Sequence, residues 1–208
     1  MLDLGTSFLA SVARDPDALA IVDGELRLTY DGWYRKISAL VAGFDDLGLH
    51  PGDHLVTLLQ NRWEAATIHW ACQFTGVIIT PLNWRSSASE LDFCLEDSEA
   101  KAIVYEEVSA EAVRSSSRAG TCQQIAVADP HTHPMTFEAL IGQSSSAVQP
   151  RVGPDAWSVM LYTSGTTARR RACRDVNAPS APQRSRMSRR ISTANVSCLL
   201  YTSPSPRD

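Results

Sequence analysis

Several features that define common protein classes are absent from this chain of 208 residues. No apolar run approaches the roughly 18 residues that a membrane-spanning helix needs, so we expect no transmembrane segment. The N-terminus carries no basic region and predicts no signal peptide. The five cysteines are odd in number and show no CxxC spacing, which argues against a metal site. Unpaired thiols also favour a reducing compartment, and we expect a cytoplasmic location.

Charge is divided unevenly along the chain. From Ala168 to the end there are nine arginines, two aspartates and no lysine, whereas residues 1–167 hold 10 basic and 21 acidic side chains. A basic tail of this kind is typical of a disordered segment, or of one that binds nucleic acid or a membrane surface. Hydrophobic periodicity also stops at Ala168, so the chain divides into two parts at this point.

The periodicity upstream of this point predicts an α/β fold, with a mostly parallel sheet and flanking helices. Alternation of strands and helices implies parallel pairing through right-handed crossovers. Strands are expected at residues 18–22, 26–30, 54–59, 77–80, 101–105, 124–128 and 157–161. Helices are expected at residues 8–14, 31–47, 61–75, 86–97 and 110–117, with one helical turn at 137–141. The expected N-caps are Thr6 or Ser7, Asp31, Asn61, and Ser86 or Ser87.

The most informative stretch is Tyr-Thr-Ser-Gly-Thr-Thr at residues 162–167, directly after the last expected strand. Its small residues leave backbone N–H groups uncovered, and the hydroxyls add donors, which together meet the needs of a phosphate-binding loop. It is not a Walker A loop, because no Lys-Ser or Lys-Thr follows Gly165. Nor is it a nucleophile elbow, because Ser164 lacks the G-x-S-x-G frame. By composition alone, an ordinary surface loop remains an alternative.

These residues resemble the phosphate-binding signature of the AMP-forming adenylating enzymes, which include acyl-CoA synthetases. The family pattern is Y/F-T-S-G-S/T-T-G-x-P-K-G, and the first six positions match. Upstream, the succession of Leu-Thr-Tyr, Gly-x-x-Pro-Gly-Asp and Gly-Val-Ile-Ile-Thr-Pro-Leu-Asn is similar to the start of an acyl-CoA synthetase. The resemblance covers roughly residues 6–167. It departs at four later positions, where Ala168, Arg170, Arg171 and Ala172 replace Gly, Pro, Lys and Gly.

The resemblance implies an incomplete N-terminal part of the large domain of such an enzyme. It implies an ATP-dependent carboxylate–CoA ligase, with a small-molecule carboxylic acid as substrate and ATP, Mg²⁺ and coenzyme A as cofactors. No catalytic residue and no protein ligand of a metal is assigned, and the chain by itself is expected to be inactive. The residues expected to hold the β- and γ-phosphates are Thr163, Ser164, Gly165, Thr166 and Thr167.

The tail at residues 168–208 has a second explanation, a shift of reading frame. Residues 168–173 can be encoded by GCC CGC CGA AGG GCG TGC. With one preceding G, the same bases read G-P-P-K-G-V, which supplies the missing half of the signature. Residues 198–208 resemble translated sequencing-adapter DNA. We therefore expect a partial N-terminal domain at residues 1–167 and an out-of-frame, disordered tail that has no specific nucleic-acid partner.

Three alternatives remain open at this stage. The chain could derive from an adenylation domain that loads a carrier protein, it could be a non-catalytic α/β module with a nucleic-acid-binding tail, or it could be an unstable product without function. The substrate acid (fatty, aromatic or alicyclic) and the oligomeric state also stay open.

Other candidate side chains are expected to have structural and not chemical roles. His131 and His133 lack a third metal ligand, His69 is expected to be packed, and Glu96, Asp97 and Glu99 indicate a solvated helix end.

Overall fold

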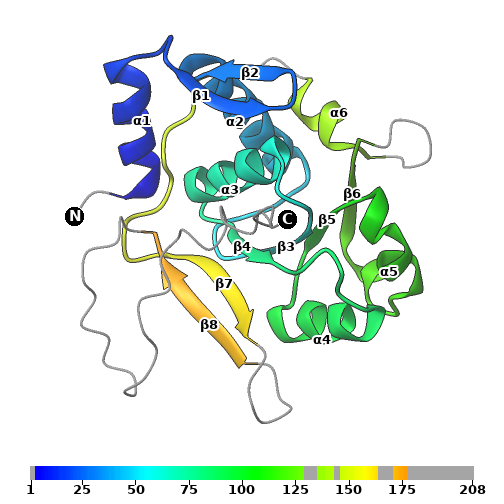
Figure 1. Ribbon diagram of the computed structural model, residues 1–208. Helices are drawn as coiled ribbons and strands as arrows, with labels where there is room; N and C mark the ends of the chain where they lie inside the picture. Colours follow the sequence, from blue (N-terminus) through cyan, green and yellow to red (C-terminus); the bar gives the residue numbers. More distant parts are fainter. Residues whose placement is uncertain (1–2, 129–134, 143–145, 164–170, 178–208) are drawn as a thin grey trace, which may run out of the picture.

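The computed structural model describes residues 3–128, 135–142, 146–163 and 171–177. Two β-sheets and their flanking helices make up this part of the chain (Figure 1). The strands are β1 (Leu19–Asp23), β2 (Leu26–Thr29), β3 (His54–Leu58), β4 (Ile78–Pro81), β5 (Ala102–Glu106), β6 (Gln123–Val127), β7 (Trp157–Thr163) and β8 (Arg171–Val176). The helices are α1 (Leu4–Arg14), α2 (Tyr30–Asp46), α3 (Trp63–Thr75), α4 (Ala88–Ser98), α5 (Ala110–Ser115) and α6 (Phe137–Ile141).

The larger sheet has six strands in the order β6-β5-β3-β4-β7-β8. Neighbouring strands are parallel, except that β8 runs antiparallel to β7. In the register, Leu55 of β3 pairs with Ala102 of β5 on one side and with Ile79 of β4 on the other. The smaller sheet is the antiparallel hairpin of β1 and β2. The predicted α/β class with a mostly parallel sheet is therefore confirmed.

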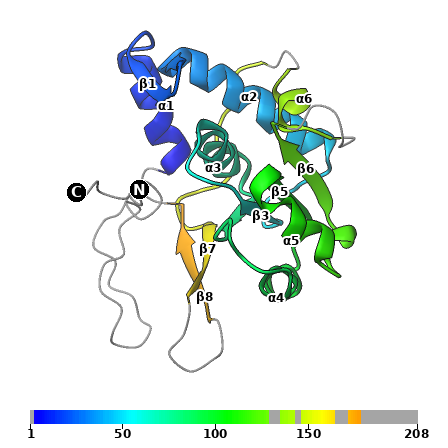
Figure 2. The same cartoon turned by 45° about the vertical axis from the view of Figure 1, so that its right-hand side comes forward.

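Helices cover both faces of the large sheet, because its strands are apolar on both sides. One cluster of buried side chains joins α1, α2, α3 and α6 to one face, and Leu55 and Val104 belong to it. A second cluster joins α4 and α5 to the opposite face, and their sheet neighbours Val56 and Ile103 belong to that one. Figure 2 shows the two helical layers on either side of the strands. Successive residues of a strand thus enter opposite cores, as the two-residue period requires.

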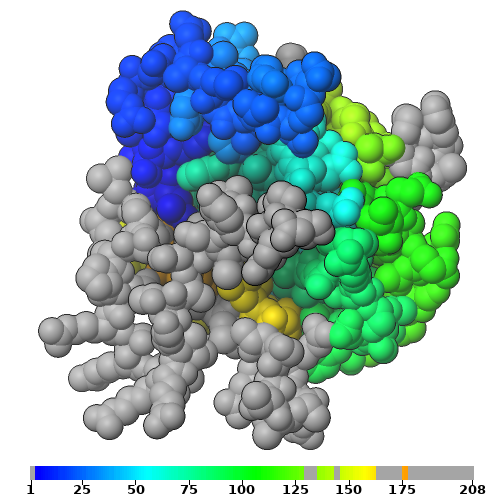
Figure 3. Space-filling view, in the orientation of Figure 1, coloured from blue at the N-terminus to red at the C-terminus, as the bar shows by residue number. Residues whose placement is uncertain are grey.

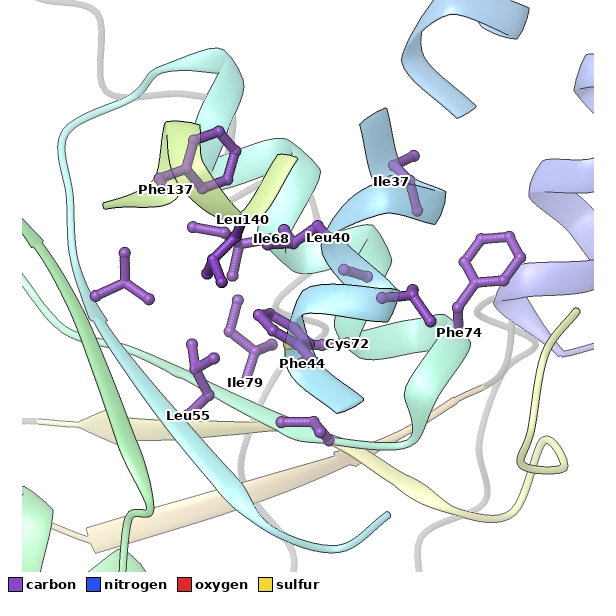
Figure 4. Close-up of a cluster of buried hydrophobic side chains, with 14 of the residues drawn as sticks. Ile37, Leu40, Phe44, Leu55, Ile68, Cys72, Phe74, Ile79, Phe137 and Leu140 are labelled. Atoms are coloured by element: carbon purple, nitrogen blue, oxygen red, sulfur yellow. The ribbon is translucent and has the colours of Figure 1, made fainter. Parts of the chain in front are cut away.

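The first core is centred on the contact between α2 and α3 (Figure 4). Leu40 and Phe44 of α2, Ile68 of α3 and Leu55 of β3 are all fully buried there. Phe8 of α1 closes the outer end of this core, with its ring centroid 4.7 Å from that of Trp70 and 5.3 Å from that of Trp33. This packing attaches the N-terminal helix to the sheet layer.

Helix N-termini differ from the sequence predictions at three places. Asp3 caps α1 by accepting from the backbone N–H of Thr6, and Thr29 caps α2 by accepting from that of Gly32. Helix α3 begins after Arg62 and has no side-chain cap hydrogen bond. The predicted caps are therefore wrong. Thr6 or Ser7 is three or four positions from the observed cap, Asp31 is two positions away, and Asn61 is one position away. An N-cap needs extended backbone dihedrals as well as a polar side chain, and local sequence does not fix those dihedrals. Ser87 caps α4 as predicted, in a capping box with Glu90.

The segment at residues 171–176 differs from the disordered tail that the sequence predicts. It forms β8, which pairs with β7 from Thr163 and Arg171 to Trp157 and Val176. The residues Arg-Ala-Cys-Arg-Asp-Val show no alternation of polar and apolar side chains, but backbone hydrogen bonding to β7 needs no particular side chain. Residues 178–208 lie outside the described part, so the expectation of disorder there stays a prediction.

Candidate functional site

The carboxyl ends of the parallel strands meet at one edge of the large sheet. Loops leave this edge after β3, β4, β5 and β7, and α3 and α4 pack on opposite faces. In open α/β sheets, ligands bind where neighbouring loops diverge to opposite faces in this way. The candidate site is therefore this edge. Two groups of residues occupy it, the end of the β7–β8 hairpin and a charged cluster after β3 and β5.

The first two residues of the predicted phosphate signature, Tyr162 and Thr163, lie at the end of β7. Tyr162 pairs with Ala172, and Thr163 pairs with Arg171, so these two pairs close the hairpin on either side of residues 164–170. Of the predicted phosphate-binding residues, Thr163 is the last residue of β7. The other four, Ser164, Gly165, Thr166 and Thr167, lie outside the described residues. Their role stays a prediction.

Tyr162 connects the signature to α4. Its hydroxyl donates to Oδ2 of Asp97 at 2.8 Å, and its ring meets the Phe93 ring at 6.0 Å with an interplanar angle of 76°. Burial and the neighbouring Asp97 carboxylate raise the pKa of the Tyr162 hydroxyl above its usual range. The phenol is therefore protonated at neutral pH and acts as the donor in this pair. In the space-filling view, atoms of β7 reach the surface beside α4 (Figure 3).

A cavity of about 370 Å³ lies at the same edge, between the β1–β2 turn and the ends of β3 and β5. Two of its acceptors are occupied by backbone donors. Glu106 accepts from the N–H of Gln60, and Oδ2 of Asp23 accepts from the N–H of Trp63 at 3.0 Å. These bonds hold the segment that leads from β3 into α3. The cavity is lined by Asp23, Leu26, Gln60, Asn61, Arg62, Trp63 and Glu106.

Arg62 bridges two buried carboxyl groups beside this cavity. Its Nε and Nη2 donate to the two oxygens of Glu64 at 2.7 and 2.8 Å, and its Nη1 donates to Oε2 of Glu106 at 2.9 Å. The exposed fractions of Glu64 and Glu106 are 4% and 6%. The hydrogen bonds to Glu64, and then those to Glu106, raise the pKa of Arg62. Because the charged groups satisfy one another, this cluster fixes the strand ends and offers no unpaired group for acid–base chemistry.

Those of the remaining candidates that the structure describes do not form a second site. Among residues 3–128, 135–142, 146–163 and 171–177, no group of three or more His, Cys, Asp or Glu side chains could hold a metal ion. His69 is packed, as expected, with its ring 5.8 Å from Trp70, and burial lowers its pKa to about 4. Burial raises the pKa of Cys94 to about 11, so this thiol is not activated. His131 and His133 lie outside the described residues.

Sequence reasoning missed two parts of this edge. Asp97 lies at an exposed helix end, as expected, but its hydrogen bond from the Tyr162 hydroxyl was not foreseen. The pair of Arg62 and Glu106 spans 44 positions of sequence, so no local pattern reveals it. One signal could have found both. Polar residues that directly follow apolar parallel strands share an edge of the sheet, and helix residues beside that edge can reach them.

The comparisons with known proteins identify the family. Residues 8–173 match the family model described as AMP-binding enzyme. The chain belongs to this family of adenylate-forming ligases. The match continues past Thr167 to Cys173, so it includes the start of β8. Among the described residues, no helix is both long and apolar enough to cross a bilayer.

Two of the relatives are enzymes whose names describe the joining of a carboxylic acid to coenzyme A or to an acyl carrier protein. A feruloyl-CoA synthase of Amycolatopsis sp is 28% identical over 166 residues, which cover 80% of this chain and 32% of the relative. The fatty acid–acyl-carrier-protein ligase ScoC of Streptomyces coeruleorubidus is 28% identical over 167 residues, which cover 78% of this chain and 30% of the relative. The chain thus spans about a third of the length of these relatives.

A solved structure supports the fold. The inhibitor-bound N-terminal domain of FACL13 from Mycobacterium tuberculosis superposes on this chain with a TM-score of 0.74 at 21% identity. The superposition covers 85% of this chain and 45% of that one. At this identity the likeness concerns the fold alone. It agrees with the prediction of an N-terminal part of an adenylating enzyme.

Proposed function

We propose that the chain is part of an ATP-dependent carboxylate–CoA ligase and carries its phosphate-binding signature. The observation that carries the proposal is that the signature of residues 162–167 begins in the last two residues of β7, Tyr162 and Thr163, in a chain of the AMP-binding enzyme family. In the first step, a carboxylate oxygen of the substrate attacks the α-phosphate of ATP and displaces pyrophosphate. In the second step, the thiol of coenzyme A attacks the acyl carbon and displaces AMP.

The signature residues act in the first step. Thr163, Ser164, Gly165, Thr166 and Thr167 supply backbone N–H groups and hydroxyls to the β- and γ-phosphates, which stabilises the charge that develops on the leaving pyrophosphate. Mg²⁺ bound together with ATP would supply further positive charge to the phosphates at these residues. Because the described residues offer no cluster of carboxylates or imidazoles for a metal, no step is assigned to a protein-bound ion.

The 208-residue chain is proposed to be inactive alone. In support, the relatives are about three times as long as this chain, and the proposed reaction also needs binding sites for adenine, ribose, the acid and the thiol. The test is an assay of ATP-dependent hydroxamate formation with the purified chain and a panel of fatty, aromatic and alicyclic acids. We expect no product, and acid-dependent product from the chain alone would contradict this part of the proposal.

The tail is proposed to result from a shifted reading frame after Thr167. The first test is resequencing of the DNA across the codons for Thr167 and Ala168 and further downstream. We expect one additional base that restores G-P-P-K-G-V, followed by a long open frame. The corrected protein should then release AMP and pyrophosphate in the presence of a suitable acid. If the bases stand as read, the tail belongs to the protein and the frame-shift proposal is wrong.

The acyl acceptor decides between two forms of the enzyme. Coenzyme A is proposed because the resemblance is to acyl-CoA synthetases and a feruloyl-CoA synthase is among the relatives. A carrier protein is the second candidate, since ScoC is a ligase for one. Mass spectrometry of the thioester formed by the corrected protein, with coenzyme A and with a carrier protein in separate reactions, distinguishes them. The proposal also includes a cytoplasmic location for the enzyme. Its partner is a small-molecule carboxylic acid substrate, and no specific nucleic-acid partner is proposed.

A further inference from the structure

We propose that Asp97 of α4 is a positioning residue for the phosphate signature and acts through the hydroxyl of Tyr162. The hydrogen bond between these two side chains fixes the carboxyl end of β7, where the chain enters residues 164–170. This inference rests on the proposed phosphate-binding role of the signature. It concerns a residue that lies 65 positions away in the sequence and outside the signature itself.

The geometry joins the end of β7 to a helix that is itself well fixed. Tyr162 is held by the Asp97 carboxylate and by the ring of Phe93, one helical turn earlier on the same face of α4. Helix α4 begins with a capping box, and its Leu91 and Cys94 are fully buried against the sheet. Phe93 and Asp97 lie on the exposed side of α4, so Tyr162 contacts the surface of a helix whose opposite side is firmly packed.

The backbone of β7 needs this support near its end. In the register between β4 and β7, Ile79 pairs with Val159, which lies three residues before Tyr162. Beyond that point β7 continues beside β8, the last strand of the sheet. A hairpin held mainly at its base can twist or bend at its tip. The contact between Tyr162 and Asp97 ties the tip of the hairpin to the helix layer.

The hydroxyl is a feature of this chain rather than a requirement of the signature, because the family pattern accepts either Tyr or Phe at this position. A phenylalanine would keep the contact with Phe93 and lose the bond to Asp97. Burial and the carboxylate keep the phenol protonated, so the donor persists over the neutral pH range. A loop that is oriented before its ligand arrives loses less entropy on binding.

Hydrogen exchange of the full 208-residue chain tests the anchoring. The variants are Y162F, D97A, D97N and the double variant Y162F/D97A, and the matched control is E96Q, which changes the adjacent carboxylate, bonded to Arg118. We expect Y162F and D97A each to speed the exchange of the backbone amides at residues 160–163 and 171–173 about tenfold. The double variant should exchange no faster than either single variant, because both remove the same bond. D97N keeps an acceptor oxygen and should be intermediate.

Binding of magnesium tripolyphosphate, measured by calorimetry on the same proteins, tests the positioning role. We expect Y162F and D97A to weaken the affinity about tenfold, and E96Q to leave it unchanged. Exchange rates equal to wild type in both variants would overturn the anchoring, and unchanged affinity alongside faster exchange would overturn the positioning role. If the wild-type chain binds no tripolyphosphate, the proposed phosphate role fails for this chain, while the exchange rates still decide whether Asp97 anchors β7.

Discussion

At the residue scale, the buried hydrogen bond between Trp33 and Thr67 links α2 to α3. The indole Nε1 donates to Oγ1 of Thr67 at 2.9 Å, and Thr67 is fully buried. Thr67→Val keeps the shape of the side chain and leaves the indole N–H without this acceptor. We expect a loss of about 1 to 3 kcal/mol in the free energy of unfolding, measured by urea denaturation. Ser11→Ala, on the outer part of α1, is the control and should change it by less than about 0.5 kcal/mol. Equal stability of wild type and Thr67→Val would show that the bond contributes nothing.

Because of His69, the free energy of unfolding should depend on pH. Burial lowers its pKa from 6.5 to about 4, so the unfolded chain binds a proton in this range and the folded chain does not. Between pH 6.5 and about 4, the free energy of unfolding should therefore fall as the pH falls. His69→Phe removes the titrating group and should flatten this part of the curve. The measurement is the midpoint of urea unfolding at several pH values. The same slope in both proteins would assign the effect to other groups.

Individual residues also show how far the sequence could be interpreted. The apolar spacing placed His69 among packed side chains, and Ser87, one of the two predicted caps of α4, does cap that helix, in a capping box that the structure adds. The hydrogen bond of Asp97 could not be predicted from its own helix, because an exposed carboxylate near a helix end has the same local pattern with or without a partner. Its partner Tyr162 comes from a strand far along the chain. Contacts of this kind depend on the packing of elements, which single-residue preferences do not encode.

At the element scale, Gly76 ends α3 in the left-handed conformation. Its φ is +80°, and an added Cβ would lie 2.5 Å from a methyl group of Val152. Gly76→Ala therefore combines backbone strain with a steric clash, and we expect it to destabilise the fold by about 2 kcal/mol or more.

Gly48 provides the matched control for this change. Its φ is +70°, and an added Cβ would meet no atom within 4 Å. Gly48→Ala should therefore show the backbone cost alone, about 1 kcal/mol. Thermal and urea unfolding of the two variants give the comparison. If Gly48→Ala were as damaging as Gly76→Ala, the contact with Val152 would not matter.

Elements with strong apolar periodicity were predicted well, whereas β8 was not. Each of β3, β4 and β5 is buried on both faces, and such runs are visible in the sequence. Segment 171–176 has an arginine-rich composition that argues against a strand. Its pairing with β7 is set by the neighbouring backbone. Strand formation at a sheet edge depends on the partner more than on the segment itself.

At the scale of the whole molecule, limited proteolysis tests the division of the chain. We expect trypsin to remove the arginine-rich tail and leave a resistant fragment that contains β3 to β6 and ends between residues 153 and 177. Mass spectrometry of the fragment locates the boundary. The outcome that contradicts the prediction is a tail as resistant as residues 3–128. Binding of RNA that disappears at high salt and on deletion of residues 168–208 would instead favour a functional basic tail.

The strand order also governs how the protein is made. On the ribosome, β3, β4, β5 and β6 emerge in succession, and they form a contiguous block of the sheet. Strand β7 belongs beside β4 but is synthesised after β6, so the outer edge of β4 stays open during this interval. That edge carries Ile78 and Ile79, both of which are buried in the finished fold. Two nascent chains on one messenger could pair through these edges. Slow translation between residues 128 and 157 would therefore lower the yield of folded protein without altering any native contact.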